Sequence, residues 1–150
     1  MKVELTIDGR GGAAEIDPGE SLMDVLRRLG HASVKNGCDR GDCGSCAVLL
    51  DGRAVNACLV FAAKADGADI TTVEGLAALH PLQRAVLDSG AVQCGFCTPG
   101  MLLTAIDLLE RSPNPTEGEV REALAGTYCR CTGYVKPVEA ILAAAQGADG

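Results

Sequence analysis

The eight cysteines are the residues whose type and spacing most clearly indicate chemistry. The first group has the spacing C-x4-C-x2-C with a distant fourth cysteine, and it consists of Cys38, Cys43, Cys46 and Cys58. Thiolates spaced in this way match the ligand pattern of plant-type 2Fe-2S clusters. The second group, a C-x2-C pair followed by a C-x-C pair, consists of Cys94, Cys97, Cys129 and Cys131. No cysteine is left over, so the sequence predicts two iron-sulfur clusters with four thiolate ligands each.

Two other uses of cysteine compete with this interpretation. Disulfides are disfavoured because a C-x-C pair is awkward to bridge and because the N-terminal segment alternates in polarity, unlike the apolar region of an export signal. Structural zinc in two four-thiolate sites also uses C-x2-C pairs, but the C-x4-C-x2-C loop and the closing C-x-C pair fit zinc ribbons poorly. Iron-sulfur clusters therefore remain the preferred prediction, with zinc and disulfides as the alternatives.

The segments around the first group must bring its fourth cysteine back to the other three. Residues 36–46 contain three glycines, which allow backbone amides to approach a cluster sulfur where a Cβ would block them. Farther on, Asp51-Gly52 is the dipeptide that a type I′ hairpin prefers, and it lies between two segments typical of strands. In the resulting register Cys46 faces Ala57, so that Cys58 lies next to Cys46 in space.

The remaining patterns predict an α+β fold. Alternation over residues 3–7, with a turn into a second strand around residues 14–16, indicates a β-hairpin. A capped helical stripe follows over residues 21–30, and residues 70–73 read as a last strand. From residue 76 onward, four apolar stripes with helical spacing predict a four-helix bundle, and they cover 82–89, 98–109, 116–124 and 138–145. We expect one helix to begin directly after Cys97 and another after Cys131, with their free N–H groups toward the second cluster.

Composition excludes several classes of function. The formal net charge is −7, with 13 basic residues scattered among 20 acidic ones, which disfavours nucleic-acid binding. No segment has the roughly 18 apolar residues of a membrane span. No G-x-G-x-x-G or Walker-type loop is present, so flavin, NAD or ATP would have to bind to another chain. His31 and His80 lie at helix ends and are expected to be ordinary residues. We therefore expect a cytoplasmic protein that moves electrons and does not itself activate a substrate.

Three blocks of sequence closely resemble the small iron-sulfur subunit of the xanthine oxidase, or molybdenum hydroxylase, family, including the small subunits of carbon monoxide dehydrogenases. They are residues 37–46, 93–100 and 129–134, and the resemblance covers almost the whole chain. It implies a β-grasp, ferredoxin-like domain over residues 1–75 that holds the plant-type cluster. It also implies an all-α domain over residues 76–150 that holds the second cluster.

The resemblance also implies partners and a direction of electron flow. The family's large subunit carries a molybdopterin cofactor and its medium subunit carries FAD, and Gln93 and Cys131 of this chain would face the pterin. Electrons would pass from molybdenum through the second cluster and then the plant-type cluster to FAD, in an assembly such as a dimer of heterotrimers. The alternatives are a free-standing ferredoxin-like carrier and an interaction module without a redox role. Tyr128 stands in a segment where the family usually has Asn, and we expect it to pack against the helical bundle.

Overall fold

Alternating apolar side chains build the first strand of a five-stranded sheet. The computed structural model describes residues 1–76 and 79–147. Strand β1 (Lys2–Ile7) pairs in antiparallel fashion with β2 (Arg10–Glu15), and the order across the sheet is β2-β1-β5-β3-β4. Strand β5 (Asp69–Thr71) pairs in parallel with β1 and antiparallel with β3. Helix α1 (Leu22–Arg28) buries one face against this sheet, which confirms the β-grasp, ferredoxin-like architecture.

The second hairpin has the predicted register. Strands β3 (Ala47–Leu50) and β4 (Arg53–Asn56) are joined by Asp51 and Gly52, whose φ angles of 49° and 80° are those of a type I′ turn. Beyond the last strand pair, the amide of Ala57 donates to the carbonyl of Cys46 at 3.3 Å. Cys58 is therefore held beside Cys46, as the sequence predicts.

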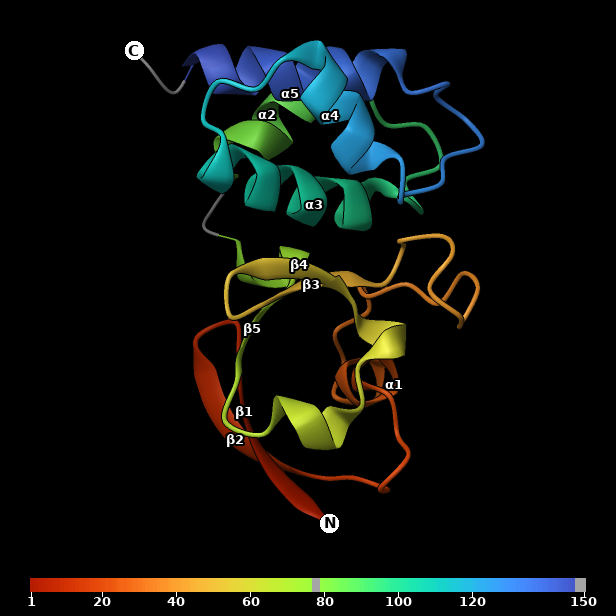
Figure 1. Cartoon of the computed structure of the whole chain (residues 1–150), viewed down its shortest axis with the longest axis vertical. Coiled ribbons are helices and arrows are strands. Elements are labelled where there is room, and N and C mark those ends of the chain that lie inside the picture. Colours follow the sequence, from red (N-terminus) through yellow and green to blue (C-terminus); the bar gives the residue numbers. More distant parts are fainter. Residues whose placement is uncertain (77–78, 148–150) are drawn as a thin grey trace.

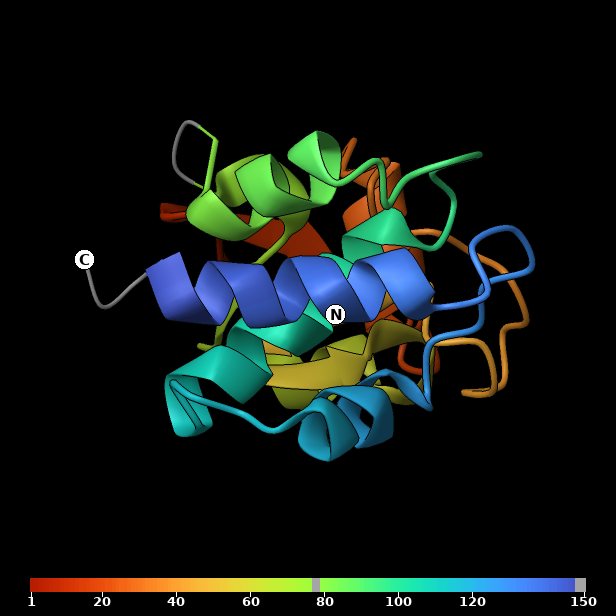
Figure 2. The same cartoon turned by 90° about the horizontal axis from the view of Figure 1, so that it is seen from above.

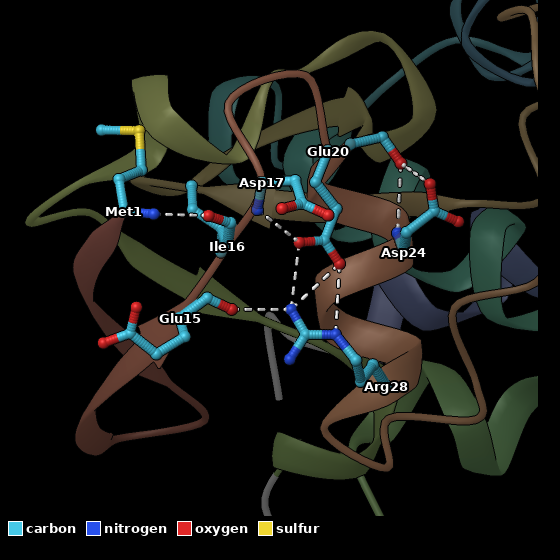
Figure 3. A network of polar contacts seen from close by, with 8 residues as sticks. Met1, Glu15, Ile16, Asp17, Glu20, Asp24 and Arg28 are labelled. Atoms are coloured by element: carbon cyan, nitrogen blue, oxygen red, sulfur yellow. Dashed lines mark hydrogen bonds and ion pairs between the residues drawn. The ribbon is translucent and has the colours of Figure 1, made fainter.

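Polar contacts fix the start of α1 (Figure 3). Ser21 accepts a hydrogen bond from the amide of Asp24 at 3.1 Å, as an N-cap residue should. Ser21 and Asp24 form only half of a capping box, because the Asp24 carboxylate accepts from the Ser21 hydroxyl and not from the Ser21 amide. Arg28 donates to both the Glu20 carboxylate and the Glu15 carbonyl, which ties the end of the helix to the end of β2.

The last strand is shorter than expected. Residues Val73–Gly75 form a 3-10 turn and not a continuation of β5. The cause is Thr72, whose amide and hydroxyl each donate to the Asp8 carboxylate at 2.7 Å while its hydroxyl oxygen accepts from the amide of Glu74. These bonds draw the chain away from the sheet and lead it into the second domain.

The second domain is helical, as predicted, and α3 lies at its centre. Its helices in the described part of the chain are α2 (Pro81–Asp88), α3 (Thr98–Arg111), α4 (Glu117–Leu124) and α5 (Val135–Gly147). Figure 1 shows α3 between the β3–β4 hairpin on one side and the other three helices on the other. Helix α3 is apolar almost all round because it is covered on both sides, and Leu49 of β3 belongs to the core of the helical domain.

One expected helix start is confirmed and the other is wrong. Helix α3 begins at Thr98, directly after Cys97. Helix α5 begins only at Val135, because Gly133 and Tyr134 have left-handed φ angles of 65° and 69° that reverse the chain before the helix.

The two domains are in direct contact. Besides the packing of α3 on the hairpin, Asp107 of α3 accepts from Arg53 of β4 at 3.0 Å and from Arg111 at 3.2 Å. The division at residues 75 and 76 stays a prediction, and residues 77–78 and 148–150 of the expected second domain lie outside the described residues. Over the described ranges, no helix is both long enough and apolar enough to cross a lipid bilayer.

Candidate iron-sulfur centres

The first cysteine loop directs backbone amides at a sulfur atom. The amides of Asp42 and Cys43 donate to the Sγ of Cys38 at 3.3 and 3.4 Å. Gly41, with φ 85°, supplies the left-handed turn that aims them, and a Cβ on Gly37 would lie only 2.8 Å from the Sγ of Cys43. The loop therefore has the close amide approach that stabilises an anionic sulfur centre.

The thiols of the first group lie close enough to shift the pKa values of two of their members. The Cys43 thiol acts on the pKa of Cys38, and the Cys58 and Cys43 thiols both act on the pKa of Cys46. Main-chain N–H groups, that of Arg40 first, lower the pKa of Cys38 to about 7. Burial raises the pKa of Cys46 to about 12. A bound metal ion deprotonates such a buried thiol outright, so this group gains its full set of thiolates on metal binding.

The second group repeats this arrangement on different elements. Cys129 and Cys94 both act on the pKa of Cys97, the residue before α3, and Cys94 and Cys129 both act on the pKa of Cys131. Burial raises the pKa of Cys97 to about 12. Burial also acts to raise the pKa of Cys129, but hydrogen bonds from the hydroxyl and amide of Thr132, at 3.1 and 3.4 Å from the sulfur, outweigh it and bring the pKa to about 7.

The spacing of the sulfurs fits a two-iron cluster better than a single zinc ion. In a tetrahedral four-thiolate zinc site, Zn–S bonds of about 2.3 Å place all the sulfurs within about 3.8 Å of one another. Among the described residues, no three cysteine sulfurs lie within 4.8 Å of one another. All eight cysteines are described and all are free thiols, which disfavours the disulfide alternative. A wider spacing of the four sulfurs suits a cluster that contains two irons.

Next to the second group, the hydroxyl of Tyr134 makes two hydrogen bonds to the backbone that the sequence did not predict. The hydroxyl of Tyr134 accepts from the amide of Cys129 at 2.8 Å and donates to the carbonyl of Thr127 at 3.1 Å. Tyr134 therefore holds the backbone on both sides of Tyr128. The glycine before Tyr134 was a signal of a turn, but only the three-dimensional structure shows where the phenol group points.

Gln93 and Cys131, the two residues expected to face a pterin, are brought together. The Gln93 amide group donates to the Cys131 carbonyl at 3.1 Å, and both residues are exposed. Cys94 is exposed as well, whereas Cys97 is buried. Figures 1 and 2 show the loops that contain the cysteines gathered at one side of the molecule. The second group thus reaches the surface through Cys94 and Cys131.

The expectation for Tyr128 is wrong. Its side chain is 59% exposed and does not pack into the bundle. Its amide instead donates across the domain boundary to the carbonyl of Cys43 at 2.9 Å. This contact could not be read from the sequence, because it depends on how the two domains are packed.

A polar cluster at the domain linker was also missed. The Nδ1 of His31 lies 3.3 Å from the Asp8 carboxylate and 3.2 Å from the Glu74 carboxylate. The amide of Ser33 donates to Glu74 at 2.8 Å. Burial acts to raise the pKa of Glu74, but this bond and others lower it overall. The cluster fastens the start of the linker to the first domain.

Known proteins match both halves of the chain. The family described as the 2Fe-2S iron-sulfur cluster binding domain matches residues 5–77, and the family described as the 2Fe-2S binding domain matches residues 72–142. The nicotine 6-hydroxylase small subunit of Paenarthrobacter nicotinovorans is 48% identical over 145 residues, covering 95% of this chain and 88% of its own length. The xanthine dehydrogenase iron-sulfur-binding subunit of Escherichia coli O157:H7 is 46% identical over 147 residues, covering 95% and 92%.

A solved structure agrees with these relatives. The aldehyde oxidoreductase from Desulfovibrio gigas superposes with a TM-score of 0.95 at 41% identity, covering 100% of this chain and 17% of that one. Relatives of this fold therefore exist both as separate small subunits and as part of a much longer chain. With both cysteine groups assembled and both halves matched, this chain belongs to the small iron-sulfur subunits of the xanthine oxidase, or molybdenum hydroxylase, family, and it serves an oxidoreductase through two 2Fe-2S clusters.

Proposed function

We propose that the chain relays electrons between a molybdopterin centre in a large subunit and FAD in a medium subunit. In this proposal the plant-type cluster is held by the first group, Cys38, Cys43, Cys46 and Cys58. The other cluster is held by the second group, Cys94, Cys97, Cys129 and Cys131. The bound clusters supply one-electron redox chemistry. The chain's own part is to hold the thiolates, donate N–H groups to their sulfurs and keep the two groups at a fixed separation.

The observation that carries the proposal is the unequal exposure of the second group. Cys94 and Cys131 reach the surface beside Gln93, while Cys97 is buried. A thiolate pair at the surface gives an electron donor on another subunit a short approach to this centre. The pair is therefore the proposed contact with the pterin, and Gln93 is proposed to hold its loop.

Exposed apolar side chains support partner binding at these loops. The core is built almost entirely from aliphatic residues, yet Phe96, between Cys94 and Cys97, is 46% exposed. Leu59 and Phe61, which follow Cys58, are exposed as well. Aromatic residues are enriched in protein interfaces, and large apolar groups at the surface commonly mark binding sites. We assign the side near Phe96 to the large subunit and the side near Leu59 and Phe61 to the medium subunit.

Affinity purification of the chain from its native host tests the proposal. A stable complex should bury roughly 800 Å² or more on each partner, so both larger subunits should remain bound under mild conditions. Recovery of the chain alone, as a monomer with both clusters, would instead support the free-standing carrier. Recovery with the large subunit only would contradict the proposed FAD partner. The dimer of heterotrimers and the cytoplasmic location stay predictions.

A further inference from the structure

We propose that the hydroxyl group of Thr132 raises the reduction potential of the second cluster by donating a hydrogen bond to a ligand sulfur. The inference rests on the proposed assignment of the second group as cluster ligands. The Oγ1 of Thr132 lies 3.1 Å from the Sγ of Cys129. Thr132 directly follows Cys131, the last cysteine of the group, and is not itself a ligand.

The neighbouring bonds determine the direction of this hydrogen bond. A threonine hydroxyl has one proton to donate and two lone pairs with which to accept. The amide of Tyr134 donates to the Thr132 Oγ1 at 3.2 Å, so one of these lone pairs is already used. A thiolate bound to a metal ion has no proton of its own. The proton between the two atoms therefore belongs to the hydroxyl, and the Cys129 sulfur is the acceptor.

The turn before α5 holds the hydroxyl in this position. Tyr134 has a left-handed φ of 69°, which is uncommon for a residue other than glycine, and here it turns the amide back toward Thr132. The phenol group of Tyr134 is fastened as well, because its hydroxyl accepts from the amide of Cys129 at 2.8 Å. The amide of Thr132 donates to the Cys129 sulfur at 3.4 Å. Rotation of the Thr132 side chain would therefore break bonds to both Cys129 and Tyr134.

The first group has no equivalent side-chain donor among the described residues. The donors to its Cys38 sulfur are the main-chain N–H groups of Asp42 and Cys43. Main-chain N–H groups are present whatever the side chain is, whereas a hydroxyl depends on the residue type at one position. Thr132 thus allows the potential of the second cluster to be set separately from that of the plant-type cluster.

The effect on the potential follows from charge. Reduction adds one electron to the cluster and increases the negative charge on its sulfurs. A hydroxyl donor close to a ligand sulfur stabilises the more negative state more strongly, and hydrogen bonds to the sulfurs are among the factors that set cluster potentials. No covalent bond changes, and the proton stays on the oxygen of Thr132. The electron comes from the molybdopterin centre in the proposed relay.

The test uses the assembled, cluster-loaded protein with Thr132→Val, which replaces the hydroxyl by a methyl group of similar size. Thr132→Ser keeps the hydroxyl and is the rescue variant. The matched control is Thr104→Val, the same change at a half-buried threonine of α3 that makes no hydrogen bond to a cysteine sulfur among the described residues. Iron content and the electron paramagnetic resonance signal of each reduced cluster establish that both centres are loaded.

A redox titration with a chemical reductant, followed by electron paramagnetic resonance, gives the midpoint potentials of both clusters. We expect Thr132→Val to make reduction of the second cluster several-fold less favourable, where a tenfold change corresponds to about 59 mV for one electron. Thr132→Ser and Thr104→Val should stay close to the parent protein, and the plant-type cluster should be unchanged in every variant. An unchanged second midpoint in loaded Thr132→Val would overturn the proposal, as would equal shifts in Thr132→Val and Thr132→Ser.

A second measurement on the parent protein keeps the proposal testable if Thr132→Val fails to load. After brief exchange into D2O, hydroxyl protons are replaced before hydrogen-bonded amide protons. Electron–nuclear double resonance of the reduced second cluster should then detect a coupled deuteron in the parent protein and in Thr132→Ser. Absence of this deuteron in the parent protein would overturn the hydroxyl donor. A parent protein that binds no second cluster would instead refute the assignment of the cysteines, and the role of Thr132 with it.

Discussion

The side-chain amide of Gln93 donates a hydrogen bond to the main-chain carbonyl of Cys131 at 3.1 Å, joining two loops that are 38 residues apart in the sequence. Both residues are exposed, so this bond contributes little to the stability of the isolated chain. Its effect is to hold the surface cysteine loop in one conformation, and we expect that conformation to matter for the large subunit.

Replacing Gln93 by Ala should therefore weaken binding to the large subunit without destabilising the fold. A single hydrogen bond is worth about 1 kcal/mol in net stability, and an exposed one less, so the unfolding temperature should change little. The affinity for the large subunit should fall, as measured by titration of purified subunits. The control is Gln146→Ala, an exposed glutamine near the end of α5. Equal affinity in both variants would contradict a role for Gln93 at the pterin-facing surface.

Replacing Asp107 by Asn should loosen the contact between the domains. Asp107 is buried and bonded to Arg53 and Arg111, but both arginine side chains are largely exposed, at 65% and 48%. Water can solvate both guanidinium groups after the change, so the loss of stability should not exceed the range of about 1.5–3 kcal/mol that is typical of hydrogen bonds to charged groups. Urea unfolding measures the loss. Increased proteolysis at the linker would accompany it, whereas an unchanged urea midpoint would show that the ion pair is not a significant interdomain contact.

Single cysteine replacements test the order of the clusters. In the assembled complex, Cys58→Ser should damage only the plant-type cluster, so substrate should still reduce the second cluster while FAD reduction stalls. Cys129→Ser should leave both FAD and the plant-type cluster oxidised after anaerobic addition of substrate. Because loss of a cluster can unfold its domain, each variant must first be shown to assemble and to retain the other cluster. An assembled Cys58→Ser complex that lacks the plant-type cluster yet reduces FAD at the unmodified rate would disprove the order.

Much of the fold could be predicted because local signals agree with it. Asp51-Gly52 defined the hairpin register, and the apolar stripe over residues 116–124 predicted α4, which begins with a complete capping box between Thr116 and Glu119. Cysteine spacing alone was enough to separate the two groups, because each spacing matches a known ligand pattern.

The misses arose where tertiary contacts override local preference. The residue types around Val73 favour a strand, but hydrogen bonds from Thr72 to the Asp8 carboxylate turn the chain before it can extend β5. The hydrogen bond from the Tyr128 amide to the Cys43 carbonyl depends on the relative placement of two domains, which no local pattern encodes. The clustering of His31 with its two carboxylates has the same origin, since its members come from three separate segments.

Metal analysis of the anaerobically purified chain tests the central claim most directly. Two 2Fe-2S clusters require about four irons and about four acid-labile sulfides per chain, held by all eight cysteines. We predict a red-brown protein with this content that loses its colour and much of its helix when iron is removed, because ligand binding and folding are coupled at such sites. A colourless, folded protein that contains stoichiometric zinc would contradict the account.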